Sequence, residues 1–387
     1  MSPTVQNIRE ELTKIKGINA DQARTMPPSY YTSPEFLELE EDHIFRKEWV
    51  CVGHTGEIPN PGDFYATDLV GEQLIVLRDE HGDVRILSNV CRHRGNMLVE
   101  GSGNRKKFIC GYHAWVYDSA GRLQNAPLMN TIDGFDKSAC TLPNFATEIW
   151  QGFIYVNLDG NAAPLADQLE GLMPIIKNYR MGERNFVYGE ETIWATNWKC
   201  LAENFMEGYH LSPTHVKTLH PITPTSLCVK MPHDDYYTGY WAKYNPKYPE
   251  RLPYPEGLTK EETRQSPMFC VNPNHVIGLA TNACVYMILR PHGPDHVAIR
   301  WGVISTAQAT DQSAIDYVEL CHDFNIEDKA KLETLQKGLK SRHLKPGYLA
   351  PADFEGTIWD MYQFMARRLG SDIELKEAMS EGQTSQK

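Results

Sequence analysis

The hydrophobic and polar positions of this chain change their spacing near residues 50 and 160. The polar N-terminus, MSPTVQNIREELTKIKG, is helix-like, and residues from about 33 to 50 begin with Ser-Pro and carry apolar positions at helical spacing. From about 50 to 160, short alternating apolar runs are separated by Gly, Asn and Asp, with candidate hairpin turns HGDV (81–84) and DSAGR (118–122). This middle stretch predicts a small antiparallel β domain.

After about residue 160 the pattern is mixed. ADQLEGLMPIIKNY and WKCLAENFMEGYHL have helical periodicity, whereas ACVYMILRPHG and HVAIRWGVIST are typical of strands. Residues 236–257 are rich in Tyr and Pro, which predicts a long loop. That loop is a candidate lid over a binding site, although a plain surface loop is an equal alternative. The aromatic residues of the candidate lid are Tyr236, Tyr237, Tyr240 and Trp241.

The predicted fold class is α+β, with an antiparallel β domain inserted after a helical segment and followed by an antiparallel sheet flanked by helices. The expected boundaries are a helical segment at 1–45 that packs on the last domain, a β domain at 46–160, a larger domain at 161–370 and a polar tail at 371–387.

Composition narrows the function classes. The net charge of −12 argues against nucleic-acid binding. No run approaches the roughly 20 apolar residues of a membrane span, and the N-terminus does not resemble a secretory signal. Nine cysteines, an odd number, favour free thiols or metal ligands over a disulfide framework. We therefore expect a cytoplasmic protein, and the sequence has no nicotinamide, flavin or nucleotide fingerprint.

Two Cys-His pairs stand in the predicted β domain. Cys91 and His93 are separated by one residue, and Cys110 and His113 by two. Zinc accepts two Cys and two His, but zinc fingers usually present a Cys pair first and a His pair later. One thiolate and one imidazole from each loop suit a [2Fe–2S] cluster with two Cys on one iron and two His on the other. Gly95 and Gly111 sit next to the ligands, where we expect that a bulky side chain would crowd the sulfurs.

A second candidate metal site lies in NWKCLAENFMEGYHLSPTHVKTLH. Non-haem iron that activates O₂ is typically held by two His and one carboxylate. On an ideal helix, His210 and His215 would point about 140° apart. Pro213 disfavours a continued helix, so a turn can bring the two imidazoles together. His220 is a competing ligand.

Both motifs resemble one family. Cys-x-His, 16 residues and Cys-x-x-His, with the flanks CRHRG and CGYHAW, resemble the cluster motif of the α subunits of the Rieske non-haem iron oxygenases. E-N-F-x-x-G-Y-H-x-x-x-x-H resembles the iron-binding segment of the same family. The similarity runs from the N-terminal helix to about residue 370. It implies a Rieske [2Fe–2S] cluster and a mononuclear Fe(II).

The resemblance also suggests the third iron ligand. Asp328 lies in NIEDKAKLETLQKGLKSR, which is similar to the family's Glu-Asp followed by an amphipathic helix. Asp360 is the next candidate, and Asp323 and Asp353 are further ones. An Asp that begins a helix is also a good N-cap. The expected buried stripe of this helix consists of Leu332, Leu335 and Leu339.

Glu207 departs from the common family pattern. Three residues before His210, it would share a helical face with that histidine. The family usually has an Asp there, which bridges the cluster of one subunit to the iron of its neighbour. By resemblance, Glu207 would accept hydrogen bonds from His210 and from His113 of an adjacent chain, with Asn204 and Tyr209 at the same junction. Glu in this position resembles the branch that oxidises carnitine, glycine betaine and other quaternary ammonium compounds.

The resemblance implies a mechanism and partners. The cluster would pass electrons to the mononuclear iron of the next subunit in a head-to-tail homotrimer, because two sites in separate domains of one chain would lie far apart. Electrons would come from a separate NAD(P)H-dependent flavin and iron–sulfur reductase, directly or through a ferredoxin. The expected reaction is monooxygenation of an N-methylated compound with O₂. The alternatives are dioxygenation of an aromatic acid and, from another class, an electron carrier or zinc-stabilised binding protein.

Overall fold

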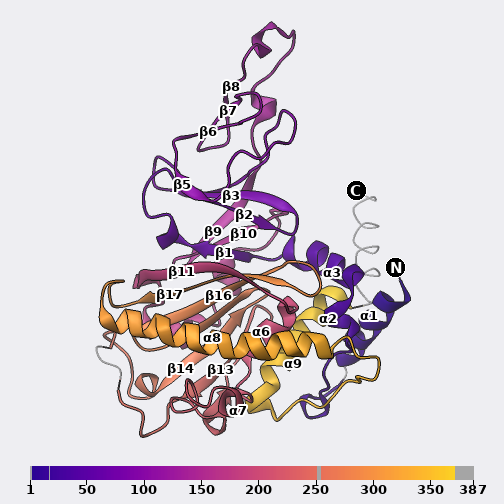
Figure 1. Cartoon of the computed structure of the whole chain (residues 1–387), viewed down its shortest axis with the longest axis vertical. Coiled ribbons are helices and arrows are strands. Elements are labelled where there is room, and N and C mark those ends of the chain that lie inside the picture. Colours follow the sequence, from indigo (N-terminus) through magenta and orange to yellow (C-terminus); the bar gives the residue numbers. More distant parts are fainter. Residues whose placement is uncertain (1, 17, 251–253, 371–387) are drawn as a thin grey trace. The chain divides into compact units, whose positions relative to one another are not determined.

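The computed structural model describes residues 2–16, 18–250 and 254–370. The chain forms two compact units, one of residues 45–165 and the other of residues 1–44 together with 166–387 (Figure 1). The predicted polar tail from 371 lies outside the described residues. Within the described ranges, every helix is too short or too polar to span a membrane.

The smaller unit consists of antiparallel strands. Seven of them form a sheet in the order β1-β10-β9-β4-β3-β2-β5, and three form a separate sheet in the order β6-β7-β8. The strands are β1 (Val50–His54), β2 (Asp63–Leu69), β3 (Glu72–Arg78), β4 (Val84–Ser88), β5 (Ser102–Asn104), β6 (Lys107–Ile109), β7 (Val116–Asp118), β8 (Leu123–Asn125), β9 (Asn144–Trp150) and β10 (Phe153–Asn157). Both predicted hairpin turns are confirmed, since they connect β3 to β4 and β7 to β8.

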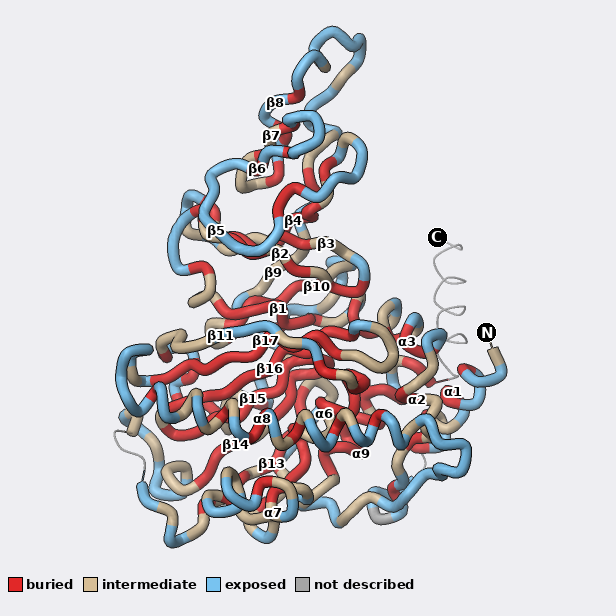
Figure 2. Tube along the Cα trace, viewed as in Figure 1, coloured by how far each residue is buried: buried red, intermediate tan, exposed pale blue. Residues whose placement is uncertain are grey.

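The larger unit is built on a second antiparallel sheet, in the order β11-β17-β16-β15-β14-β13-β12. Figure 2 shows its strands as mostly buried. The strands are β11 (Asn185–Trp194), β12 (Cys228–Lys230), β13 (Tyr237–Lys243), β14 (Gln265–Val271), β15 (His275–Leu279), β16 (Ala283–Pro291) and β17 (Val297–Ser305). The strands predicted from ACVYMILRPHG and HVAIRWGVIST are β16 and β17.

The prediction of one long loop at 236–257 was wrong in its first third. Tyr237–Lys243 forms β13, which pairs with β12 and β14. Aromatic residues and Thr favour strands, and no Pro interrupts the run before residue 246. The candidate-lid residues Tyr237, Tyr240 and Trp241 therefore belong to the sheet, and Tyr236 precedes it.

Helices cover this sheet. In the larger unit α6 packs on β13, β14, β15 and β16, α8 contacts α6, β11 and β16, and α9 contacts α6, β12 and β13 (Figure 1). The α-helices are α1 (Pro3–Ile15), α2 (Ser29–Thr32), α3 (Pro34–Glu40), α4 (Leu165–Gln168), α5 (Met173–Ile176), α6 (Trp198–Met206), α7 (Leu211–Thr214), α8 (Gln312–Gly338) and α9 (Ala352–Leu369). Short 3₁₀ turns and one π-helical turn, Glu41–Phe45, complete the chain.

The N-terminal helices are tied to the rest of the larger unit by buried polar contacts. Arg9 on α1 donates to the backbone carbonyl of Leu369 at the end of α9, at 2.9 Å. Glu40, at the end of α3, accepts from Lys199 Nζ at 2.5 Å and from Trp198 Nε1 at 2.8 Å. Both side chains of the Glu40–Lys199 pair are almost completely buried. This pair fixes the N-terminal segment to α6, the helix that leads into the candidate metal site.

We predict that Lys199→Met destabilises the protein by about 3–5 kcal/mol, because it leaves the Glu40 carboxylate buried without its cation. The double variant Glu40→Leu/Lys199→Met should recover most of this loss. Denaturant unfolding measures both. The control is Lys14→Met, which removes an exposed ion pair with Glu11 and should leave the unfolding free energy unchanged. Equal losses in the single and double variants would contradict the account.

Candidate metal centres

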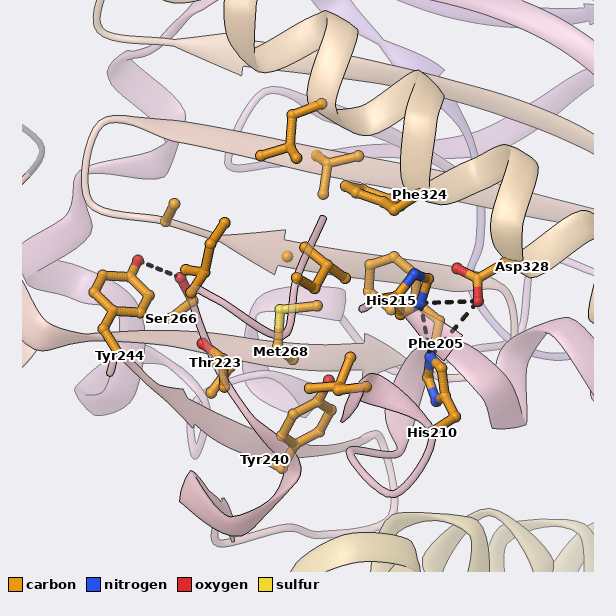
Figure 3. Close-up of a pocket in the computed structure, with 18 of the residues that line it drawn as sticks. Phe205, His210, His215, Thr223, Tyr240, Tyr244, Ser266, Met268, Phe324 and Asp328 are labelled. Atoms are coloured by element: carbon orange, nitrogen blue, oxygen red, sulfur yellow. Dashed lines mark hydrogen bonds and ion pairs between the residues drawn. The ribbon is translucent and has the colours of Figure 1, made fainter. Parts of the chain in front are cut away.

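Three side chains of the larger unit meet at one point. Nε2 of His210 lies 3.2 Å from Nε2 of His215, and Oδ1 of Asp328 lies 3.1 Å from His215 Nε2 and 3.6 Å from His210 Nε2. One ligand atom from each residue lies within 4.8 Å of the others, so the three could hold a metal ion. Figure 3 shows the two imidazoles and the carboxylate facing one another at one end of a pocket.

A break in the chain after α6 brings the two histidines together. The helix ends at Met206, and Glu207 is extended (φ −114°, ψ 148°). His210 directly precedes the one-turn helix α7, and His215 directly follows it. Gly208 is required within this break, because a Cβ there would lie 2.4 Å from Cys228 Sγ. The prediction that Glu207 and His210 share a helical face was therefore wrong, because the helix ends before both residues. The turn nevertheless places their side chains in contact.

Asp328 reaches the site from the middle of a helix. We predicted a helix that begins near this residue, but α8 begins at Gln312, so Asp328 is not an N-cap. Phe324, one turn earlier, also lines the pocket. The expected leucine stripe is only partly correct: Leu332 is buried, whereas Leu335 is 46% exposed.

The competing ligands lie elsewhere. His220 is exposed and its Nδ1 contacts Ser212 Oγ at 2.9 Å. Asp360 forms ion pairs with Lys230 and His233. Asp323 and Asp353 are exposed, and the Asp353 carboxylate accepts from the backbone N–H of Lys230.

A carboxylate orients each histidine from behind. Glu207 Oε1 lies 2.5 Å from His210 Nδ1, and its other oxygen accepts from the backbone N–H groups of Tyr209 and His210. Burial disfavours protonation of His210, but Glu207 and Asp328 outweigh it and raise the pKa of this imidazole. Glu327 Oε2 lies 2.7 Å from His215 Nδ1. Both contacts leave Nε2 of the histidine turned toward the shared point.

Sequence reasoning did not assign a role to Glu327. It stands beside Asp328, and neighbouring residues of a helix normally point in different directions. Here the second carboxylate reaches His215 from the other side, where Thr218 also donates to it. A Glu-Asp pair in a helix opposite two histidines is the signal that could have identified it.

The pocket beside these three residues has a volume of about 100 Å³. It is mostly apolar, and its lining comes from the sheet, α6, α8 and the segment 210–223 (Figure 3). Of the two further residues predicted at the subunit junction, Asn204 lines this pocket, whereas Tyr209 is 55% exposed and packs near Phe354. The junction itself stays a prediction. Five aromatic side chains contribute to the wall: Phe205, Tyr240, Tyr244, Tyr317 and Phe324.

The smaller unit brings its two Cys-His pairs together. Each cysteine begins a tight turn, because the carbonyl of Cys91 accepts from Gly95 N–H and that of Cys110 accepts from Ala114 N–H, both at 3.0 Å. The rings of His93 and His113 are 4.6 Å apart. Both cysteines are buried, whereas His113 is exposed.

The surroundings of the two thiols differ. Burial raises the pKa of Cys91, although Tyr117 and a backbone N–H at His93 oppose the effect. Burial also disfavours ionisation of Cys110, but backbone N–H groups of Tyr112 and His113 outweigh it and lower its pKa. Such N–H groups would equally stabilise a thiolate bound to iron.

Our reason for Gly95 is not supported by its packing. A Cβ at this position would contact no described atom, and neither would one at Gly111. Gly95 instead has φ +76°, in the left-handed region that favours glycine. The turn after Cys91 therefore needs glycine for its backbone conformation.

Both donor sets fit their expected metals. His93 Nδ1 and Asp328 Oδ1 are among the buried polar atoms that have no hydrogen-bond partner in the described part of the chain, although Asp328 Oδ1 lies 3.1 Å from His215 Nε2. Buried polar atoms are normally satisfied, so each is suited to a metal ligand. Two Cys with two His match a Rieske cluster, and two His with one carboxylate match non-haem iron.

Comparison with known proteins identifies the family. Residues 48–144 match the Rieske [2Fe-2S] domain, and residues 179–371 match the catalytic domain of the ring-hydroxylating α subunit. The carnitine monooxygenase oxygenase subunit of Acinetobacter baumannii is 30% identical over 340 residues, which are 84% of this chain and 87% of that protein. This chain belongs to the Rieske oxygenase α subunits.

Solved structures agree with this assignment. The quaternary ammonium Rieske monooxygenase CntA, in complex with L-carnitine, superimposes with a TM-score of 0.78 at 25% identity, over 91% of this chain and 96% of that one. Naphthalene 1,2-dioxygenase from Rhodococcus sp. has the same fold, with a TM-score of 0.78 at 22% identity, over 94% and 98% of the chains. The anthranilate 1,2-dioxygenase large subunit of Acinetobacter baylyi is 35% identical, but over only 48% of this chain and 41% of its own.

As a Rieske oxygenase α subunit, the chain is an oxidoreductase that incorporates O₂. It carries a [2Fe–2S] cluster in its Rieske domain and a mononuclear iron in its catalytic domain. Enzymes of this family work with a separate reductase. The predictions of family, fold class, cofactors and oxygenase chemistry are therefore confirmed.

We predict that Glu327→Gln weakens divalent-metal binding at the His210–His215–Asp328 site by about 10- to 100-fold, because an orienting carboxylate raises the basicity of its histidine. Titration of metal-free protein with Co(II), followed by its visible absorption, measures the affinity. The matched control is Glu319→Gln, an exposed position on the same helix. Unchanged affinity in Glu327→Gln would show that this carboxylate does not support the site.

Proposed function

We propose that this Rieske oxygenase monooxygenates a quaternary ammonium or other N-methylated compound. The observation that carries the proposal is the aromatic wall of the pocket next to His210, His215 and Asp328. Aromatic faces attract a cation through their quadrupoles. No Lys or Arg occurs among the described residues that line the pocket, so a cationic substrate meets no repelling charge there. The carnitine monooxygenase subunits and CntA, similar over most of the chain, support the same substrate class.

A second hollow, of about 290 Å³, shares Tyr317 and Leu320 with the pocket. The carboxylates of Glu250 and Asp316 are part of its lining. Acidic groups beside a low-dielectric pocket attract cations from solution. This hollow is therefore a suitable entrance for a positively charged substrate.

We propose that His210, His215 and Asp328 hold the mononuclear iron, and that Cys91, His93, Cys110 and His113 hold the cluster. When bound, the cluster supplies single electrons and the iron supplies O₂ activation. The chain's own residues orient these groups.

Glu207 fixes His210 through Nδ1, and Asn204 lies where the pocket meets the break after α6. In a head-to-tail homotrimer, Glu207 would also accept from His113 of an adjacent subunit. A structure of CntA has been related to inter-subunit electron transfer in that enzyme.

The proposed reaction is the oxidative removal of one N-methyl group. One oxygen atom of O₂ enters a methyl C–H bond, and the other becomes water after the uptake of two electrons and two protons. The resulting N⁺–CH₂OH group loses formaldehyde and a proton, which leaves a tertiary amine. The electrons come from an NAD(P)H-dependent flavin and iron–sulfur reductase, directly or through a ferredoxin.

The test is O₂ uptake and formaldehyde release with a surrogate reductase. We expect both with choline-like or betaine-like compounds, and neither with 3,3-dimethylbutan-1-ol, the neutral carbon isostere of choline. His210→Ala should keep the visible spectrum of the cluster and lose turnover. Oxidation of benzoate-like acids alone would instead indicate an aromatic dioxygenase. Full function of His210→Ala would indicate an electron carrier.

A further inference from the structure

A third cavity, separate from the metal pocket and from the hollow beside Glu250, borders another face of α6. Its volume is about 420 Å³, and it is walled by the segment around Tyr31, by α6, by leucines from the end of α8 and by α9. Three carboxylates line it, from Glu203, Glu207 and Glu355. Asn204 lines both this cavity and the metal pocket. The two spaces therefore meet at one amide side chain, next to the carboxylate that holds His210.

Glu203 is an unusual carboxylate for this position. Both of its oxygens lie 3.1 Å from Tyr31 Oη, which also contacts Tyr362 Oη at 2.9 Å. The nearest basic residue on its own helix, Lys199, is paired with Glu40. Among the described residues Glu203 forms no ion pair. Glu203 is half-buried, and a partly desolvated carboxylate without a cation is costly unless it binds a proton.

The protonation of Glu203 follows from these surroundings. Burial raises the pKa of Glu203 to about 8, while the Tyr31 hydrogen bond and the charge of Lys199 oppose the rise and the charge of Glu355 adds to it. At neutral pH the carboxyl is therefore mostly protonated, and it releases that proton as the pH rises through about 8.

The other titratable groups around Glu203 do not replace it as a proton source. Burial raises the pKa of Tyr31, Tyr362 and Cys200 well beyond neutral pH, so these groups stay protonated. Burial also raises the pKa of Glu355, on α9. Lys345 lines the cavity from the loop before α9, and α8 contributes only leucines to the lining.

The proposed reaction needs such a source. Each turnover consumes two protons, yet the lining of the metal pocket has no carboxyl besides the proposed ligand Asp328. A cavity of about 420 Å³ with three carboxylates in its wall is large and polar enough to hold water, and chains of water conduct protons. The route from Glu203 to the metal pocket leads through this water and past Asn204.

We propose that Glu203 supplies protons for O₂ reduction. Its carboxyl O–H releases a proton to water in the cavity, and a hydrogen-bonded chain that includes Asn204 leads from there to the metal pocket. Solvent then reprotonates the carboxylate. This inference rests on the proposed monooxygenase function. Glu203 acts through water and Asn204 and touches neither substrate nor metal. In this proposal α6 has two roles: it carries the proton source Glu203, and its C-terminal end leads to the two histidines.

The first test is independent of activity. In metal-free protein, the infrared band of a protonated carboxyl should disappear with a midpoint near pH 8 and be absent from Glu203→Gln. Tyr31→Phe should move the midpoint to higher pH, because the lost hydrogen bond favoured the carboxylate. A midpoint at pH 4 to 5 would overturn the proposal.

The second test uses a single turnover of pre-reduced, substrate-loaded holoenzyme. Wild-type turnover should slow above about pH 8. Glu203→Gln keeps the shape of the side chain and its contact with Tyr31, but it has no proton to release. We therefore expect its single-turnover rate to fall about 10-fold or more at pH 7 and to stay constant from pH 6.5 to 9.5. We also expect this variant to release more hydrogen peroxide than the wild type. Glu203→Asp should recover part of the rate, and Glu319→Gln should match wild type.

Two results would overturn the proposal even if the infrared band behaves as expected. If Glu203→Gln reacts at the wild-type rate, the carboxyl is not a proton source and serves only as a hydrogen-bond acceptor for Tyr31. A slow variant that keeps the wild-type fall above pH 8 would show that Glu203 acts only by position. If no substrate is turned over, the proposed function fails, while the infrared midpoint still reports on the carboxyl itself.

Discussion

The catalytic unit depends on the meeting of two imidazoles and a carboxylate from segments far apart in the sequence. His210 and His215 come from a broken helix, and Asp328 comes from the middle of α8. Glu207 and Glu327 stand behind the two histidines, so three carboxylates surround two imidazoles in a partly buried place. Such a concentration of negative charge is unfavourable unless a cation occupies its centre. The fold of this region therefore favours a bound metal ion.

Helix α6 transmits this constraint to the rest of the unit. It packs on four strands of the sheet, and Lys199 and Trp198 at its start bind the buried Glu40 of the N-terminal segment. Its end leads directly into the break that positions His210. One face of the helix borders the aromatic pocket and another borders the carboxylate-lined cavity. Substrate binding and proton supply can thus be separated by a single layer of side chains, with Asn204 common to both.

The sequence predicted the local chemistry better than the long-range geometry. Cysteine and histidine spacing alone indicated two metal centres, because these ligands lie close together in the chain. The choice of Asp328 relied on resemblance, since no local pattern separates it from Asp360. The strand at 237–243 was missed because its many tyrosines suggested a lid. The start of α8 and the extended backbone at Glu207 depend on packing against the sheet, which periodicity does not reveal. Glu203 gains its character only when Tyr31 of α2 bonds to it and α9 forms a wall of the cavity around it.

The most direct measurement is the content of iron, zinc and acid-labile sulfide after anaerobic reconstitution, for wild type and for Asp328→Ala. The account predicts the two irons and two sulfides of the cluster plus one further iron in the wild type. The variant should lose that further iron and keep the cluster with its reduced-state paramagnetic signal. Zinc in place of iron, or an unchanged iron content in Asp328→Ala, would contradict the account.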